Sequence, residues 1–262
     1  RGTLNYTVPK ASPPKVVDRS HFEIHGEISE DWVWTTAGNP YQVTGPVLVK
    51  SRTNLTINPG VVIELASCQA AINIEGSIDA SGTATSPITW KLSSNVKNCG
   101  YDTPPSFLQF STGIGEKQSI LQHNVMKGDH NSHQRSETKC IHIRSSNASK
   151  PLNVIKSTFD YCKIIVEEAT DKKDEVTGKL KGVALHVQDS ELSHSTAIAN
   201  YIGYDLLRST ISNSELYAVN HARLSLFSSA TSNTRISSTA NGHVCILDSQ
   251  VYGNRIYASG YN

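Results

Sequence analysis

Two arginines and two tyrosines near the C-terminus are the residues of this sequence best suited to chemistry. Arg235 and Arg255 lie one repeat apart, and Tyr252 and Tyr257 flank the second arginine. A guanidinium binds acidic groups through paired hydrogen bonds, and some polysaccharide lyases use a Lys or Arg as base or neutralising group. A solvated sheet face with aromatic cover is the simpler interpretation. The patch is therefore our alternative site, for binding or catalysis.

A histidine-containing segment is the second candidate. Asp129, His130 and His133 are close in sequence, and an H-x-x-H pair on a loop can bind a metal. No Cys or Glu completes a spacing typical of zinc sites, and no helix is predicted to fix the geometry. We therefore predict no metal and no other cofactor. We keep these three residues, with Tyr101 in another irregular segment, as ligand-contacting loop candidates.

Carboxylates decide whether hydrolysis is plausible. Glycoside hydrolases use two carboxylic residues, and Ca²⁺-dependent lyases use an acidic cluster. Asp160, Asp189 and Asp248 each stand alone in their repeat, and no two aspartates are adjacent in the chain. The Gly-His within Asn241–Cys245 lacks carboxylate partners. We therefore expect no hydrolase or lyase turnover.

A third function class is ice binding, which needs rows of Thr-X-Thr on a flat face. One such triplet, Thr83–Ala84–Thr85, is present, and it does not recur at the repeat spacing. Ice binding is therefore our second alternative, after a polysaccharide-active enzyme.

Composition excludes several other classes. The net charge is +1 and charged residues make up 18% of the chain, which argues against a nucleic-acid partner. No apolar run is long enough for a transmembrane helix, so we predict no membrane insertion. The chain opens without Met or a signal peptide, so we expect a processed or trimmed chain.

These residues must be positioned by a repeated element, and the sequence contains one. An eight-residue phrase has Ser at position one, apolar or small residues at three and eight, and a small polar residue at six. It occurs at Ser119–Met126, Ser157–Ile164, Ser190–Ala197, Ser209–Leu216, Ser229–Ile236 and Ser249–Ile256. A period of roughly 20 residues with two short apolar stretches is typical of stacked coils.

The repeat positions predict which side chains are buried. Positions three and eight are apolar with one exception, so we expect two inward columns that stack in register. Position six is always small, as a tight corner with a side chain bonded to the backbone requires. No segment shows a helical period, and short alternating runs bounded by Gly, Pro and Asn indicate strands.

The run from Trp34 to Trp90 adds a family resemblance. WTTAGNPYQVTGPVLV, NLTINPGVVIEL and INIEGSIDASGTATSPITWK resemble, in order and spacing, the opening of parallel β-helix repeat proteins of bacterial surfaces and secreted material. The resemblance implies an all-β, right-handed parallel β-helix, which we expect to have about nine coils. It implies no activity, because members of that group are adhesive, structural or attached to catalytic domains.

We predict one β-helix domain at residues 31–262, preceded by an extended arm at residues 1–30. Three segments interrupt the period: Ser93–Pro104, Lys127–Thr138 and Glu167–Lys181. Insertions of repeat folds often gather on one binding face. We therefore expect ligand binding at these loops.

Five cysteines leave at least one thiol free or paired between chains. Cys140 and Cys162 lie about one coil apart, and stacked coils are about 4.8 Å apart, within disulfide reach. Cys68 and Cys99 are a second candidate pair. Reduced cysteines that fill core positions are an equal alternative.

These observations favour a non-catalytic, secreted or cell-surface module of a fibre or matrix. We expect it to bind a glycan or protein ligand. Because an uncapped solenoid end invites edge pairing, we also expect the C-terminal end to be continued by more chain or covered by a neighbouring subunit, through end-to-end or lateral self-association.

Overall fold

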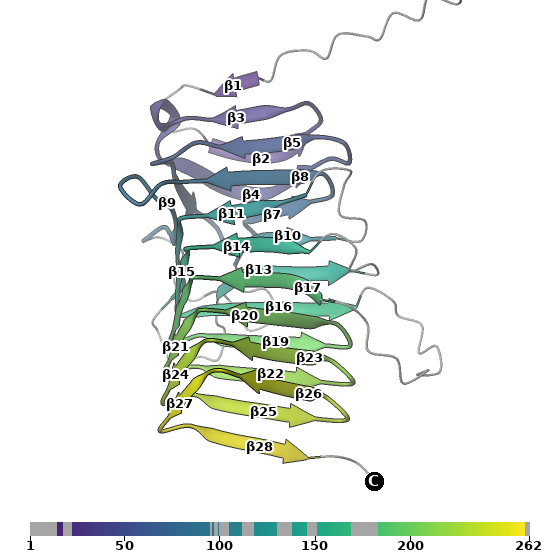
Figure 1. Cartoon of the computed structure of the whole chain (residues 1–262). Coiled ribbons are helices and arrows are strands. Elements are labelled where there is room, and N and C mark those ends of the chain that lie inside the picture. Colours follow the sequence, from purple (N-terminus) through teal and green to yellow (C-terminus); the bar gives the residue numbers. More distant parts are fainter. Residues whose placement is uncertain are drawn as a thin grey trace, which may run out of the picture.

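A computed structural model shows the chain as one stack of short parallel strands, from the first coils at the top of Figure 1 to the last at the bottom. It describes residues 15–17, 23–94, 96, 99, 105–111, 118–129, 138–145, 151–168 and 183–259. No helix in these ranges is long and apolar enough to cross a membrane.

One side of the stack is a 10-stranded sheet, here sheet A. Its strands are β1 (Lys15–Val17), β3 (Trp32–Trp34), β5 (Asn54–Ile57), β8 (Ser77–Ser81), β11 (Ile120–Gln122), β14 (Leu152–Ile155), β17 (Val183–Gln188), β20 (Gly203–Leu207), β23 (Arg223–Phe227) and β26 (His243–Leu247). A short 3-10 helix, η1 (Thr36–Gly38), follows β3.

The remaining strands form two ladders that are joined through β4 (Tyr41–Val49). Ladder B contains β6 (Val62–Leu65), β9 (Ile88–Leu92), β12 (Asn124–Lys127), β15 (Thr158–Asp160), β18 (Glu191–Ser193), β21 (Thr210–Ser212), β24 (Ala230–Ser232) and β27 (Gln250–Tyr252). Ladder C contains β2 (Glu23–Ile28), β7 (Ala71–Ile74), β10 (Ser106–Phe110), β13 (Thr138–Ser145), β16 (Cys162–Glu168), β19 (Thr196–Asn200), β22 (Glu215–Val219), β25 (Arg235–Thr239) and β28 (Arg255–Ser259).

Each coil runs from sheet A through ladder B to ladder C, and equivalent residues stack on one another. The inward column of ladder B has one residue per coil. It consists of Tyr41, Ile63, Trp90, Met126, Phe159, Leu192, Ile211, Thr231 and Val251. All but Val251 are buried. The prediction of a parallel β-helix with about nine coils is confirmed.

The first repeat phrase is out of register with the other five. Met126 pairs with Phe159, so it belongs to position three rather than eight. The N–H of Asn124 donates to Ser157 Oγ, which places Asn124 at position one. The counterpart of Ile164 is Ile141, on the far side of the Lys127–Thr138 insertion. The phrase Ser119–Met126 was assigned to the wrong strands because the spacing of its two apolar residues also matches one residue on sheet A, Leu121, and one on ladder B, Met126.

Two strands of the stack lie within residues 1–30, where the sequence predicted an extended arm. β1 pairs with β3 and β2 pairs with β4, although both lie within residues 1–30. Ile24 and Ile28 are buried in the core, whereas the other residues of β2 are exposed. These apolar residues bring β2 into the stack, so the β-helix begins before residue 31.

Small residues at position six form the corner between ladders B and C, as predicted. The residue before each has a positive φ: Tyr161, His194, Asn213, Asn233 and Gly253. The backbone N–H of one corner bonds the side chain of the next, from Cys162 to Ser195 and from Ser195 to Ser214, both at 3.1 Å. The same device recurs at position one, between sheet A and ladder B.

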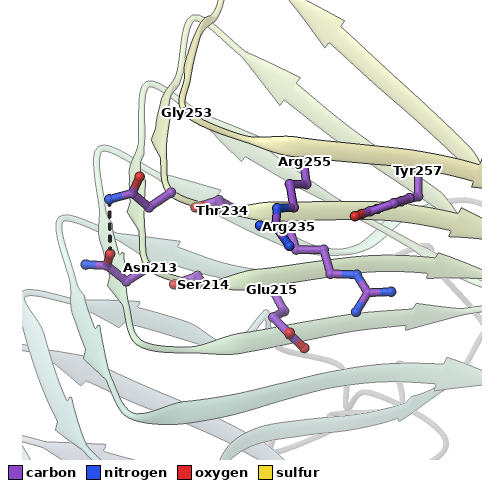
Figure 2. A pocket seen from close by; sticks show the side chains of 9 residues that line it. Asn213, Ser214, Glu215, Thr234, Arg235, Gly253, Arg255 and Tyr257 are labelled. Atoms are coloured by element: carbon purple, nitrogen blue, oxygen red, sulfur yellow. Dashed lines mark hydrogen bonds between the residues drawn. The ribbon is translucent and has the colours of Figure 1, made fainter.

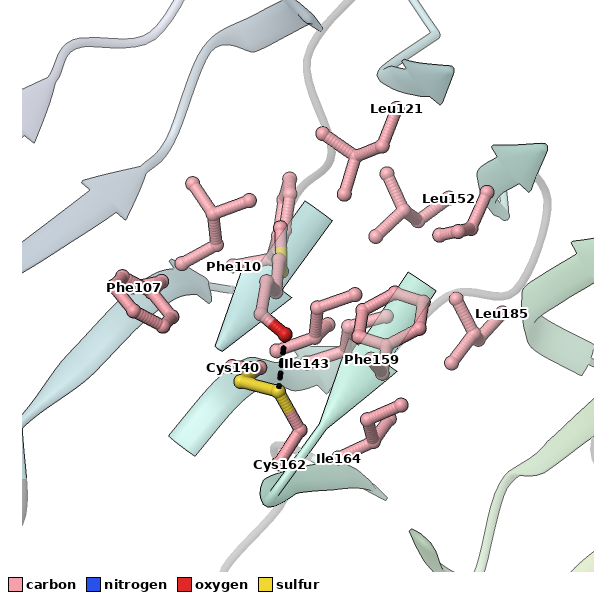
Figure 3. Close-up of a cluster of buried hydrophobic side chains, with 14 of the residues drawn as sticks. Phe107, Phe110, Leu121, Cys140, Ile143, Leu152, Phe159, Cys162, Ile164 and Leu185 are labelled. Atoms are coloured by element: carbon pink, nitrogen blue, oxygen red, sulfur yellow. Dashed lines mark hydrogen bonds between the residues drawn. A yellow bond between two sulfur atoms is a disulfide. The ribbon is translucent and has the colours of Figure 1, made fainter. Parts of the chain in front are cut away.

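Two disulfides join Cys68 to Cys99 and Cys140 to Cys162, and Cys245 is free. These are the two pairs considered from the sequence. Figure 3 shows the second disulfide packed among Phe107, Ile143 and Phe159 in the core. It links the adjacent strands β13 and β16, so it fixes two consecutive coils covalently.

The three insertions do not share one corner. Ser93–Pro104 follows β9 and Lys127–Thr138 follows β12, so both connect ladder B to ladder C. Glu167–Lys181 connects β16 to β17, from ladder C to sheet A. Most of each insertion lies outside the described residues.

Candidate functional site

The outer face of ladder C brings Arg235 and Arg255 together. Glu215, Arg235 and Arg255 occupy the same register position on β22, β25 and β28. The next residues in these strands, Leu216 and Ile236, point into the core. Strand alternation therefore directs the two guanidinium groups outward, on neighbouring coils about 4.8 Å apart.

Two tyrosines hold Arg235 in place. Tyr217, Ser237 and Tyr257 stack in register on the same three strands. The guanidinium carbon of Arg235 lies 5.8 Å from the ring centre of Tyr217 and 5.1 Å from that of Tyr257. The small Ser237 between the rings leaves room for this arrangement. Cation–π attraction to both rings restricts the Arg235 side chain.

A hollow of about 550 Å³ lies beside this group at the corner of ladders B and C. It is lined by Asn213, Ser214, Glu215, Asn233, Thr234, Arg235, Gly253, Arg255 and Tyr257. Figure 2 shows Arg235 and Arg255 close together with Tyr257 beside them. Glu215, the carboxylate of the lining, accepts a hydrogen bond from Tyr217 Oη at 2.5 Å. The two guanidinium groups give the hollow a positive charge that suits an acidic ligand.

The structure separates the residues that the sequence grouped. Arg235, Arg255 and Tyr257 line the hollow together. Tyr252 is not among the lining residues, and its side chain points outward from ladder B with 81% of its surface exposed. Asp129 lies next to β12, where its N–H donates to Thr138 Oγ1 at 3.2 Å. Tyr101, His130 and His133 lie outside the described residues.

Two of the three single aspartates of the repeats, Asp160 and Asp189, pair with a basic side chain at corners. Asp160 Oδ1 accepts from Ser193 Oγ at 2.9 Å and lies 3.1 Å from His194 Nδ1. Asp189 receives two hydrogen bonds from Arg208, at 2.7 and 3.0 Å. Hydrogen bonds from Arg208 and then Gln188 lower the pKa of Asp189 to about 2. These carboxylates connect coils and are not arranged as an acid–base pair.

Sequence reasoning missed a polar network on the outer face of sheet A. His186, Asp205 and Ser225 occupy one outward position on β17, β20 and β23. His186 Nδ1 lies 3.3 Å from Asp205 Oδ2, and Arg223 Nη2 lies 3.9 Å from Asp205 Oδ1. Arg223 Nε donates to Ser225 Oγ at 2.7 Å. The sequence signal for this network is that its residues occupy equivalent positions in consecutive coils. That signal can be recognised only when the register of the strands is known.

Asp205 is charged in this network. Burial raises the pKa of Asp205, but hydrogen bonds with His186 and Ser225 and electrostatic attraction to His186 and Arg223 outweigh it. The net effect is a pKa below the ordinary value. Asp205 Oδ1 is buried and has no hydrogen-bond donor among the described residues.

Metal chelation is not supported by the described part of the chain, where no three His, Cys, Asp or Glu residues are grouped closely enough to hold an ion. The fully described hollow offers one carboxylate against two arginines. Its chemistry therefore suits an anion rather than a cation.

One of the comparisons with known proteins, the match to a family model, agrees with the fold over part of the chain. Residues 26–101 match the family described as pectate-lyase like beta helix domain. A 98-residue segment is 35% identical to Protein bark beetle of Drosophila melanogaster, and the match covers 37% of this chain but 3% of that protein. A structural match to the A-module of the mannuronan C-5 epimerase AlgE4 from Azotobacter vinelandii covers 88% of this chain and 89% of that chain, at 9% sequence identity. Its TM-score of 0.20 is too low to bear on the fold or the function of this chain.

Proposed function

We propose that this parallel β-helix is a non-catalytic module of an extracellular surface or matrix structure, and that it binds an acidic glycan on the outer face of ladder C. The observation that carries the proposal is the pair of stacked arginines, Arg235 and Arg255, in a hollow lined by polar side chains. Arginine forks recognise carboxylate and sulfate groups with paired hydrogen bonds.

The tyrosine next to the arginines supports a sugar as the ligand. Tyr257 is 47% exposed and borders the hollow, so its ring offers an apolar surface to the C–H groups of a sugar. Aromatic rings with a polar tip are well suited to such half-wet contacts. Because Arg235 is already held between Tyr217 and Tyr257, little side-chain entropy is lost when it binds an anion.

The same geometry argues against cleavage at this hollow. Hydrolysis of a glycoside uses two carboxylic groups, whereas Glu215 is the single carboxylate among the lining residues. An exposed guanidinium keeps its proton and so serves poorly as a base. The match to a pectate-lyase-like domain keeps a lyase as the runner-up.

The cysteines support an extracellular location. Four of the five form disulfides, and disulfides persist in oxidising compartments. A rigid stack of coils that presents one charged face fits a structural or adhesive role.

Binding assays with polyuronates, sulfated glycans and neutral glycans test this proposal. We expect the acidic glycans to bind at low salt and to be released as salt rises. The double variant Arg235→Ala/Arg255→Ala should lose at least about 10-fold in affinity, as expected for charge-assisted hydrogen bonds. Arg144→Ala removes an exposed arginine of the same ladder that pairs with Glu167, and serves as the control.

Two outcomes would overturn the proposal. Equal binding by the double variant would show that the arginines are not the site. Release of unsaturated or reducing sugar ends that depends on Arg235 or Arg255 would establish the runner-up enzyme instead.

A further inference from the structure

We propose that the hollow at the corner of ladders B and C selects a glycan in which acidic sugars alternate with neutral ones, and that Glu215 makes this selection. The inference rests on the proposed function, because it assumes that Arg235 and Arg255 bind an acidic group in the hollow. It adds which class of acidic glycan is accepted. A uniform polyuronate and an alternating glycan meet the same arginines but place different groups beside Glu215.

The charged side chains of the hollow form one row that runs along the stack. Glu215, Arg235 and Arg255 occupy the same register position on β22, β25 and β28. Neighbouring coils are about 4.8 Å apart, so the two adjacent guanidinium groups can share one carboxylate of a ligand. A glycan that continues from this carboxylate along the row toward β22 reaches Glu215 next. The row therefore offers two positive charges followed by one negative charge.

Glu215 presents its carboxylate to the ligand instead of neutralising an arginine. Tyr217 Oη donates to Glu215 Oε2 at 2.5 Å and so fixes the side chain, which is exposed. Within the described ranges, no ion pair joins Glu215 to Arg235 or Arg255, and no donor reaches its second oxygen, Oε1. One carboxylate oxygen is thus anchored and the other is open to the hollow.

This arrangement repels one kind of ligand and accepts another. A uniform polyuronate carries a carboxylate on every sugar, so a chain bound at the arginines brings a further negative charge toward Glu215, and like charges repel. An alternating glycan brings a neutral sugar there instead. A hydroxyl group of that sugar can donate to Glu215 Oε1 in a charge-assisted hydrogen bond. The carboxylate therefore favours the alternating glycan.

A second row in the hollow also suits a neutral sugar. Asn233 Nδ2 donates to Asn213 Oδ1 at 3.5 Å, which is the dashed line in Figure 2. Asn213 Nδ2 and Asn233 Oδ1 have no partner in the part of the chain that the structure describes, so one donor and one acceptor remain. A Cβ at Gly253 would approach Asn233 Oδ1 to 3.0 Å, so the glycine leaves this end of the row open. Hydroxyl or amide groups of a neutral sugar can pair with both atoms.

Calorimetry with two tetrasaccharides of equal length, at low salt and with the whole chain, tests the selection. One tetrasaccharide alternates glucuronate with N-acetylglucosamine, and the other consists of galacturonate alone. Net charge would favour the galacturonate tetrasaccharide, which carries twice as many carboxylates, so the opposite order is diagnostic. We expect the alternating tetrasaccharide to bind at least about 3-fold more tightly, the size of effect that an exposed charge pair produces.

The variant Glu215→Gln removes the negative charge and keeps the size of the side chain. It should raise the affinity for the galacturonate tetrasaccharide by about 3-fold and reduce the preference accordingly. Glu191→Gln is the matched control, because Glu191 is an exposed glutamate of β18 that does not line the hollow. This control should leave the preference unchanged.

The outcomes separate this inference from the proposed function. If both tetrasaccharides bind equally and both lose affinity in Arg235→Ala/Arg255→Ala, the selection is overturned and the acidic-glycan site stands. A preference that persists in Glu215→Gln would overturn the role of Glu215. Binding of neither tetrasaccharide, or binding that does not depend on the arginines, would overturn the proposed function and this inference together.

Discussion

The backbone N–H of Ser209 donates a hydrogen bond to Oγ of Ser229, its counterpart in the next coil, at 3.1 Å. Ser229 Oγ in turn donates to the carbonyl of Phe227 at 2.9 Å. One hydroxyl therefore satisfies a buried N–H of one coil and a carbonyl of its own.

Ser229→Ala should destabilise the protein by about 1–3 kcal/mol, because the N–H of Ser209 is left without its acceptor. Urea unfolding monitored by circular dichroism measures the loss. Ser212→Ala, on the outer face of ladder B, is the control and should have little effect. A Ser229→Ala protein as stable as wild type would show that the ladder contributes nothing.

Ile211→Asp should cost on the order of 3–5 kcal/mol, because it buries a charge without a partner in the inward column of ladder B. Val251→Asp in the same column should cost far less, since Val251 is 39% exposed. Comparable losses of unfolding free energy in the two variants would contradict the difference in burial.

The pair of Asp189 and Arg208 should make stability depend on pH in the acid range. The pKa of Asp189 is about 2 in the folded chain against 3.8 as the ordinary value. A depressed carboxyl pKa stabilises the fold above the unfolded value, and this contribution is lost as pH falls through the folded value.

Melting curves of wild type and Asp189→Asn measure this effect, and Asn also tolerates the positive φ of 50° at this corner. Wild type should melt slightly higher at pH 6, and the two curves should converge near pH 2. The difference should shrink in high salt, because the pair is exposed. A gap that widens on acidification would show that another group is responsible.

Replacing residues 130–137 by two glycines should leave the melting temperature nearly unchanged, because the entropy of closing a loop changes only slowly with its length. Gly128 and Thr138 must be kept, because any side chain at 128 would collide with the carbonyl of Tyr161 and Thr138 Oγ1 bonds Asp129. If the loops contribute to ligand binding, the same deletion should weaken it. Unaltered affinity would restrict binding to the sheet faces.

For the isolated 262-residue chain, we predict self-association through the last described coil. Val251 and Ile256 are 39% and 56% exposed. Their counterparts in the preceding coil, Thr231 and Ile236, are buried. Sedimentation should therefore reveal concentration-dependent oligomers. Val251→Ser/Ile256→Ser should shift the protein toward monomer by reducing the exposed apolar surface. A wild-type chain that stays monomeric over a wide concentration range would end this proposal.

The inward columns could be predicted from the sequence because burial makes the apolar period strict. Ile211, Leu216 and Ile236 were placed correctly since successive repeats differ by at most one residue. Met126 was misplaced because an insertion between β12 and β13 removed the regular spacing that fixes the register. A single sequence offers no independent way to locate such an insertion within a coil.

The outward residues were harder to predict. Arg235 and Arg255 were grouped because they fall at equal positions of two regular repeats, and Tyr257 was added because it lies two residues beyond Arg255. His186, Asp205 and Arg223 were missed because each looks like an ordinary surface residue until β17, β20 and β23 are stacked. The positive φ of Tyr161 and His194 could not be predicted either, since neither residue type is typical of the left-handed backbone conformation.

The disulfide between Cys140 and Cys162 has a mechanical consequence. Tension applied along the stack peels coils away one after another, since each coil is bonded chiefly to its two neighbours. The bridge encloses a sequence separation of 22 residues. This bridge alone would therefore withhold roughly 70–80 Å of a pulled chain's contour length until it is reduced, in addition to the stretch enclosed by Cys68–Cys99. In a load-bearing matrix this bond would act as a fixed limit on extension.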